Sequence, residues 1–268
     1  MIIICNGAFK SGSTWLFLII EEILKLKSKN CNETLRKEWQ SSKNSAFLFN
    51  DGNIKEALPH YLDKNDSFFL TKAHFLSEET YVTLKENCND ELKIFFIERD
   101  LGDAIVSHYH HVITQTNKNF SLNKYFNLIG KFKAKEIVSF SLMRKKYLSQ
   151  SSHSLYFEDL KTDFSNEVIK VASFLGFNLT QEEIVLIQQN TSLSNLKDKA
   201  KQGQLTQYSA DSEKASKLFR KGIVGEGLKT LSKTQRNQLS NIKNGRTSVF
   251  YKLYYLLFFK LRRSIYKM

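Results

Sequence analysis

NGAFKSGSTWL, residues Asn6–Leu16, follows the apolar, β-branched run Ile2–Cys5 and leads into Ser13–Lys27, where apolar residues recur at helical spacing. The sequence therefore predicts a strand, a glycine-containing turn and a helix in direct succession. Backbone N–H groups at such a helix N-terminus bind anions, so the stretch predicts an anion site. A glycine turn with solvated polar residues is the alternative. The stretch differs from the nucleoside-triphosphatase signature G-x-x-x-x-G-K-[ST], because Lys10 precedes the second glycine, Gly12, instead of following it.

The rest of the chain alternates between strand-like and helix-like patterns. Short apolar runs predict strands, and stretches with helical periodicity predict helices between them. Strands are expected at Ser67–His74, Leu92–Arg99 and His153–Leu160, helices at Ser77–Cys88, Asp100–Thr116, Asn166–Phe177 and Thr180–Asn190, and a long polar loop at Asp198–Lys217. This alternation indicates a three-layer, P-loop-like α/β fold with a central, mostly parallel sheet flanked by helices.

Length and composition are those of one globular domain. The chain has 268 residues, 41% of them hydrophobic and 25% charged, and a single proline, so no Pro/Gly-rich linker divides it. We expect one domain over residues 1–246 and a basic, aromatic helix over 247–268. The three cysteines, Cys5, Cys31 and Cys88, form no C-x-x-C pair, which favours free thiols in a reducing cytosol. The apolar start has no positive flank and is too short for a signal peptide, so a cytoplasmic protein is expected.

Polar side chains of several kinds fall where the predicted strands end. They are Lys10 with its loop, Lys72 with His74, and Arg99. Because ligands of such sheets bind beyond the carboxyl ends of the strands, these groups predict one site on that rim.

Lys72 and His74 stand two residues apart on a strand, so both side chains can face the same side of the sheet. An imidazole takes up a proton near neutral pH, and an ammonium group beside it can neutralise a transferred anion. A structural role for His74 is the alternative. His108, His110 and His111 occupy helix positions that point apart, so no metal site is expected there.

Two further stretches carry guanidinium groups, which suit phosphate monoesters through paired hydrogen bonds. Arg99 stands eight residues before Ser107. Ion pairs of Arg99 with Glu98 or Asp103 are the alternative. The stretch Arg220–Gly222 follows the polar loop and can form a second phosphate clamp, with solvated charge as its alternative.

Taken together and in order, these stretches resemble the cytosolic sulfotransferase family, whose members move a sulfuryl group from 3′-phosphoadenosine 5′-phosphosulfate (PAPS) to a hydroxyl or amine. The chain has FKSGSTW where the family has a motif like P-K-S-G-[ST]-T-W, KAH where it has K-T-H, and RKGIVG where it has R-K-G-x-x-G. The spacing of Arg99 and Ser107 and the segments YFEDLK and TSLSNLK resemble further family stretches. The Lys- and Asn-rich composition is compatible with a microbial member of the family.

The resemblance implies a donor site for PAPS that needs no metal. His74 matches the family's general base, and Lys72 matches a residue that steadies the transferring sulfuryl group, with Lys10 beside it. Trp15 matches an aromatic residue that packs on the adenine, and Thr191 matches a purine contact. The residues that match the 5′-phosphosulfate site are Lys10, Ser11, Gly12, Ser13 and Thr14, and those around the 3′-phosphate are Arg99, Ser107, Arg220, Lys221 and Gly222.

The chain departs from the family pattern at several positions. Phe157 stands where the family often has a tyrosine, and Leu193 where it often has a purine-stacking phenylalanine, so looser adenine packing is expected. The first strand starts at once, and part of the usual acceptor-pocket wall is therefore expected to be missing. No segment like the family's dimer-forming one follows RKGIVG, so the oligomeric state is left open.

The sequence thus predicts in-line transfer of the sulfuryl group of PAPS to a hydroxyl of a small molecule or glycan. A P-loop nucleotide kinase or nucleoside triphosphatase and a non-catalytic basic binding protein are the alternatives. No specific nucleic-acid partner is expected, because +10 of the net charge of +13 lies in Gly227–Met268 and the rest of the chain carries only +3. The acceptor itself is not encoded in a readable way by the loops expected to hold it, Leu35–Lys64, Asn117–Lys135 and Thr206–Leu218.

The C-terminal segment Ser248–Met268 has no counterpart in the family. Its uninterrupted apolar run, Leu253–Phe259, is far shorter than the about 20 residues of a membrane span. Two interpretations remain. The segment is either a basic, aromatic helix on the inner face of an anionic membrane, or a helix packed on the body of the protein with its lysines at the surface.

Co-sedimentation with anionic liposomes distinguishes these interpretations. If the segment binds membrane, the whole chain sediments with the liposomes at low salt, and a version that ends at Gly245 stays in the supernatant. Equal behaviour of the two versions contradicts membrane binding by the segment.

Overall fold

The protein contains a five-stranded sheet. A computed structural model describes residues 1–29, 48–49, 52, 54, 56, 68–88, 91–116, 120–146, 151–205, 216–217 and 219–246. The strands are β1 (Ile2–Gly7), β2 (Leu48–Phe49), β3 (Phe69–Ala73), β4 (Leu92–Glu98) and β5 (Ser152–Tyr156), in the order β2-β3-β1-β4-β5. Every pairing between them is parallel, which confirms the sheet expected from the sequence.

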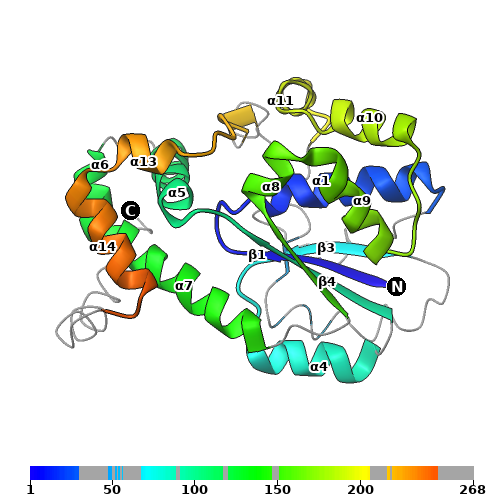
Figure 1. Cartoon of the computed structure of the whole chain (residues 1–268), viewed down its shortest axis with the longest axis horizontal. Coiled ribbons are helices and arrows are strands. Elements are labelled where there is room, and N and C mark those ends of the chain that lie inside the picture. The colour runs from blue at the N-terminus through cyan, green and yellow to red at the C-terminus, as the bar shows by residue number, and fades with distance from the viewer. Residues whose placement is uncertain are drawn as a thin grey trace. The chain divides into compact units, whose positions relative to one another are not determined.

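Helices cover both faces of this sheet. Figure 1 shows α1 (Ser13–Leu26), α8 (Phe157–Thr162) and α9 (Phe164–Phe174) on one face and α4 (Glu78–Cys88) on the other. All six residues of β1 are buried, as expected for a central strand that is covered on both sides. The three-layer α/β fold is therefore confirmed.

One hydrophobic core joins the sheet to the helices on the α1 face. Ile3 and Phe95 from the strands meet Leu16 of α1 and Val168 of α9, and all four are fully buried. The helices α10 (Gln181–Asn190) and α11 (Leu193–Lys201) add Ile187 and Leu196 to the same core. A capping box of Thr180 and Glu183 is present at the start of α10.

The strand register fixes the rim where the site lies. Asn6 of β1 is opposite Ala73 of β3, and Gly7 is opposite Ile97 of β4. The residues that follow these three strands therefore leave the sheet at the same level, and the chain from Gly7 to Gly12 emerges between the ends of β3 and β4.

The chain groups into two compact units, Met1–Arg99 with Met143–Val224 and Asp100–Leu142 with Gly225–Met268. The sheet belongs to the first unit. The second contains α5 (Leu101–Thr116), α6 (Leu122–Tyr125), the π-helical turn η2 (Phe126–Gly130), most of α7 (Lys131–Lys146), α13 (Glu226–Thr230) and α14 (Lys233–Lys243).

A buried carboxylate holds the second unit together. Asp103 of α5 is fully buried and accepts hydrogen bonds from the backbone N–H groups of Gly225, at 2.8 Å, and Gly227, at 2.6 Å. A methyl group on Gly227 would lie 2.4 Å from the carbonyl carbon of Gly102, so α5 and α13 meet backbone to backbone at a point where only glycine fits. The chain that follows the stretch Arg220–Gly222 is thereby tied to α5.

The predicted strand His153–Leu160 is wrong in its second half. The strand β5 ends at Tyr156, and Phe157 starts α8. Phe157 and Leu160 are three residues apart and both buried, which is helical periodicity. Glu158 and Asp159 stand in the first turn of α8, where the helix dipole favours carboxylates.

The loop predicted from Asp198 starts too early in the sequence. Helix α11 continues to Lys201, and its buried residues Leu196 and Ala200 are four apart. The side chain of Ser192 caps this helix by accepting from the N–H of Asn195. Residues 206–215 of the predicted loop lie outside the described residues.

Residues 247–268 also lie outside the described part of the chain. The helix expected there, the boundary at residue 246 and the choice between its two interpretations stay predictions. Within the described ranges, no helix has both the length and the apolar character that crossing a membrane requires.

Candidate anion-binding active site

The loop between β1 and α1 is a tight turn that opens toward the N-terminus of the helix. Gly12, the N-cap of α1, has a left-handed backbone with φ of 101°, a conformation that glycine adopts without strain. Ser11 closes the turn, since its Oγ donates to the carbonyl of Ala8 at 2.8 Å. Because Gly12 has no side chain, it cannot cap α1, and the first N–H groups of the helix are placed to receive an anion.

Lys72 reaches into this loop from β3. Its Nζ donates to Oγ1 of Thr14 at 2.7 Å, and its side chain is buried. Burial, and then the charge of Lys10, lower the pKa of Lys72 to about 8. The hydrogen bond to Thr14 places the Lys72 ammonium group at the first turn of α1, which contains no acidic residue.

Lys10 brings a second, half-buried charge to the same place. Its backbone is left-handed, with φ of 62°, which is uncommon for a residue with a side chain. Burial lowers the pKa of Lys10 to about 8, followed by repulsion from Arg99 and then from Arg220. Positive charges from three separate loops are thus close enough to act on one another, as expected for a site that receives a multiply charged anion.

His74 follows β3 and is held in a defined tautomer. Its Nδ1 lies 2.7 Å from the carbonyl oxygen of Gly7. A carbonyl oxygen only accepts, so Nδ1 carries the proton, and Nε2 is the basic nitrogen of the neutral ring. The ring of Phe9 packs beside the imidazole, with 5.2 Å between the ring centroids. In this tautomer Nε2 is the ring nitrogen that can accept a proton.

Arg99, directly after β4, contacts both the loop between β1 and α1 and the segment that follows Arg220–Gly222. Its Nη2 donates to the carbonyl of Ile223 at 2.8 Å, and its Nη1 to the carbonyl of Lys10 at 3.4 Å. The carboxylates proposed as alternative partners have other contacts. Glu98 pairs with Arg144 at 2.8 Å, and Asp103 accepts from the two glycines described above.

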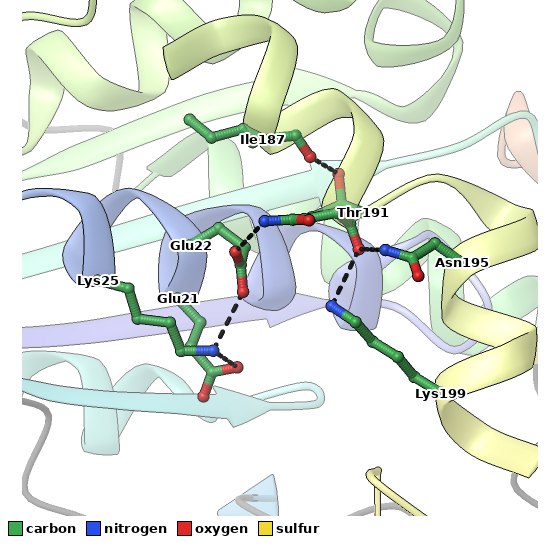
Figure 2. A network of polar contacts seen from close by, with 8 residues as sticks. Glu21, Glu22, Lys25, Ile187, Thr191, Asn195 and Lys199 are labelled. Carbon is green, nitrogen blue, oxygen red and sulfur yellow. Dashed lines mark hydrogen bonds and ion pairs between the residues drawn. The ribbon is translucent and has the colours of Figure 1, made fainter. Parts of the chain in front are cut away.

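Trp15 and Thr191 meet although 176 residues separate them in the sequence. The indole Nε1 of Trp15 donates to the carbonyl of Thr191 at 3.0 Å, and the ring stacks on Phe164. Thr191 is buried, and its Oγ1 donates to the carbonyl of Ile187 at 2.7 Å (Figure 2). These contacts place an aromatic ring and a backbone segment together beside the phosphate loop.

The end of α10 is tied to α1 by a polar network that supports Thr191. The side chain of Asn190 donates to Glu22 of α1 at 2.8 Å, and Glu22 also pairs with Lys25 at 3.1 Å. Asn195 of α11 donates to the carbonyl of Asn190 at 3.0 Å (Figure 2). The position of Thr191 therefore depends on α1, which also carries the anion site.

The structure brings most of the predicted site residues into the first unit. They are Lys10, Ser11, Gly12, Ser13, Thr14, Trp15, Lys72, His74, Arg99, Thr191, Arg220, Lys221 and Gly222. Lys221 is exposed, and Gly222 has a left-handed backbone with φ of 58°. Ser107 lies half-buried on α5 in the second unit.

Three of the other histidine and cysteine residues considered from the sequence are buried in the protein interior. His108 is buried and shares a 2.7 Å hydrogen bond between its Nδ1 and the hydroxyl of Tyr125. Cys5 and Cys88 are free thiols and are buried, which raises the pKa of each. Among the described residues, no three His, Cys, Asp or Glu side chains are grouped as a metal site would need.

Sequence reasoning missed the role of Phe157. Its ring lies against both Gly12 and Arg99, so it touches the phosphate loop instead of only neighbouring an adenine site. Its departure from the family pattern was visible in the sequence, but its contacts depend on the start of α8, which was predicted as strand.

The fold and the site together define a class of protein. It is an α/β protein with a glycine-containing loop at a helix N-terminus, lysine and arginine side chains around that loop and a histidine of fixed tautomer at its edge. A family model described as a sulfotransferase domain matches residues 2–249. The chain therefore belongs to the sulfotransferase family and is a sulfuryl-transferring enzyme.

Individual relatives agree with this assignment. Sulfotransferase 1B1 of Mus musculus is 26% identical over 247 residues, which cover 89% of this chain and 80% of the relative. Sulfotransferase 1E1 of Rattus norvegicus is 28% identical over 234 residues, which cover 81% and 73%.

Solved structures share the fold. Mouse sulfotransferase SULT7A1 complexed with PAP superposes with a TM-score of 0.63 at 20% sequence identity. The match covers 90% of this chain and 81% of the SULT7A1 chain. Retinol dehydratase in complex with androsterone and the inactive cofactor PAP superposes with a TM-score of 0.61 at 15% sequence identity. The match covers 91% of this chain and 80% of the retinol dehydratase chain.

Anion binding at this site is expected to weaken as the pH rises. Lys10 and Lys72 have pKa values of about 8 in the free protein, so both are largely charged at pH 7 and largely neutral at pH 10. Sulfate does not titrate in this range. The rise in melting temperature that sulfate causes, relative to chloride at equal ionic strength, should therefore decrease from pH 7 to pH 10.

The matched control is Lys10→Met, which removes one of the two titrating charges and leaves the general salting-out effect of sulfate. Its sulfate response should be smaller and depend less on pH. A response that is constant from pH 7 to pH 10, or equal in the variant, contradicts the assignment of the two lysines to the anion site.

Proposed function

We propose that the site binds PAPS and that the enzyme transfers its sulfuryl group directly to a hydroxyl of a small molecule or glycan. The observation that carries this proposal is the convergence of Lys10, Arg99 and Arg220 on the N-terminus of α1, with His74 held beside them. Two of the structural relatives are complexes with PAP, adenosine 3′,5′-bisphosphate, which is the product that PAPS leaves behind.

The two ends of such a donor have different partners in the proposed site. The 5′-phosphosulfate would lie on the loop that contains Lys10 and Gly12, because loop and helix N–H groups surround a phosphate at close range. The 3′-phosphate would lie against Arg99 and Arg220, with Lys221 and Gly222 around it. Trp15 and Thr191 would hold the adenine. A clamp for the 3′-phosphate discriminates against ATP, which has none.

Charge stabilisation is the main task of the lysines. Sulfuryl transfer resembles phosphoryl transfer in passing through a loose, anionic transition state, so positioning and positive charge contribute most of the catalysis. Lys72 is already oriented by Thr14, and Lys10 by its left-handed backbone. The site therefore needs little rearrangement to place both charges beside the transferring group.

His74 completes the reaction as the proton acceptor. The acceptor oxygen forms a bond to sulfur while the bond from sulfur to the 5′-phosphate oxygen breaks, and the proton of the acceptor passes to Nε2. The hydrogen bond from Nδ1 to Gly7 stabilises the imidazolium that results. The products are the sulfated acceptor and PAP, and the proton later leaves His74 to solvent.

The identity of the acceptor is the finer part of the proposal. Two of the three loops expected to form its pocket, Leu35–Lys64 and Thr206–Leu218, lie largely outside the described residues. The third prediction, a loop over Asn117–Lys135, is wrong for most of its length, because α6, η2 and the start of α7 occupy it. A hydroxyl is favoured because its proton is weakly acidic and needs the base that His74 offers. A screen of phenols, alcohols and oligosaccharides with labelled PAPS decides between the small-molecule and glycan classes.

Substitution of His74 tests the general base. His74→Asn keeps an N–H group that can donate to the carbonyl of Gly7 but has no equivalent of Nε2, and His74→Ala loses both. Each variant is expected to lower kcat by about 10²–10⁴-fold while its affinity for PAP stays near that of the wild type. Transfer of label from PAPS and calorimetric titration with PAP measure the two quantities. Wild-type kcat in His74→Asn would exclude His74 as the base.

A further inference from the structure

Phe157 lies where the parts of the anion site meet. It is the first residue of α8, directly after β5, and its side chain is 5% exposed. Its ring contacts Gly12 in the loop between β1 and α1, Arg99 after β4 and Trp15 of α1. Gly222, in the stretch Arg220–Gly222, is also near, since a methyl group built on it would lie 4.0 Å from the ring.

The contact with Arg99 is a cation–π interaction. The central guanidinium carbon lies 4.2 Å from the centroid of the Phe157 ring. The same guanidinium donates along its edge to the carbonyls of Ile223 and Lys10. The aromatic ring and the two backbone carbonyls therefore hold the guanidinium of Arg99 in the absence of a ligand.

The contact with Gly12 shapes the phosphate loop. A methyl group on Gly12 would lie 2.6 Å from Cδ2 of Phe157, which is closer than carbon atoms approach. The ring thus lies directly on the left-handed turn that precedes α1. Leucine at residue 157 would keep an apolar side chain over the turn but would remove the π face from the guanidinium.

We propose that Phe157 is a positioning residue that preorganises Arg99 for the 3′-phosphate of the nucleotide. This inference rests on the proposed function, because that function assigns the 3′-phosphate to Arg99. Phe157 touches no reacting atom and acts through the arginine. A preoriented guanidinium loses less conformational freedom when the phosphate binds, so the ring adds affinity for that phosphate and not for the rest of the nucleotide.

The proposal predicts a selective loss of affinity. Phe157→Leu keeps an apolar side chain but removes the π face, and should weaken PAP binding by about three- to thirtyfold, the range that a cation–π contact covers. Affinity for AMP, which has no 3′-phosphate, should change less than twofold. Phe157→Tyr keeps the ring at a position where the family often has tyrosine, and should restore PAP affinity.

The experiment is calorimetric titration of the full chain with PAP and with AMP, in a double-mutant cycle with Arg99→Ala. If Phe157 acts through Arg99, Phe157→Leu has no further effect on PAP affinity in the Arg99→Ala background. Phe95→Leu is the matched control for loss of a buried ring, because Phe95 lies in the hydrophobic core and packs against His153 and Phe174. It should leave both affinities unchanged.

The outcomes separate the two proposals. Wild-type protein that fails to bind PAP overturns the proposed donor. Wild-type protein that binds PAP overturns the positioning role if Phe157→Leu binds PAP equally well, loses AMP and PAP affinity in parallel, or has the same effect with and without Arg99. Selective loss that Phe157→Tyr restores and Arg99→Ala abolishes supports it.

Discussion

Mutual repulsion among Lys10, Lys72, Arg99 and Arg220 is the constraint that the site must satisfy before any ligand binds. Burial and the neighbouring positive charges lower the pKa of both lysines to about 8. Lys72 is oriented by the hydroxyl of Thr14, and Arg99 by two carbonyls and an aromatic face. Neutral acceptors of this kind fix the direction of a cation and leave its charge available to an anion.

The fold supplies the rigidity that this arrangement needs. The turn from Gly7 to Gly12 is held between the ends of β3 and β4, whose register with β1 is set by the parallel sheet. The helix α1 that begins there is buried in the main core through Leu16 and Ile20. Concentrating positive charge at this point costs stability, which the apolar packing of the sheet and helices offsets. A bound dianion would relieve the repulsion, so the same feature destabilises the free protein and favours the complex.

Much of this could be predicted from local patterns, and the remainder depends on distant contacts. The strand, turn and helix from Ile2 to Leu26 carry their own periodicity and glycines, so their position was predicted correctly. The end of β5 was not, because Leu155 and Phe157 continue an apolar run while the chain changes from strand to helix between them. Helix α7 was missed because the charged residues Lys133 and Arg144 occupy buried positions and interrupt its apolar pattern. They pair with Glu136 and Glu98. The meeting of Trp15 with Thr191 required the family resemblance, since no local signal relates residues so far apart.

Thermal stabilisation by PAP, compared with ATP and Mg²⁺, tests the central claim most directly. A ligand that binds only the folded protein raises its melting temperature by mass action. The proposed site predicts a clear rise with PAP that is lost in Arg99→Ala and is not reproduced by ATP with Mg²⁺. A rise with ATP and Mg²⁺ alone would contradict the account and assign the opening loop to a different nucleotide chemistry.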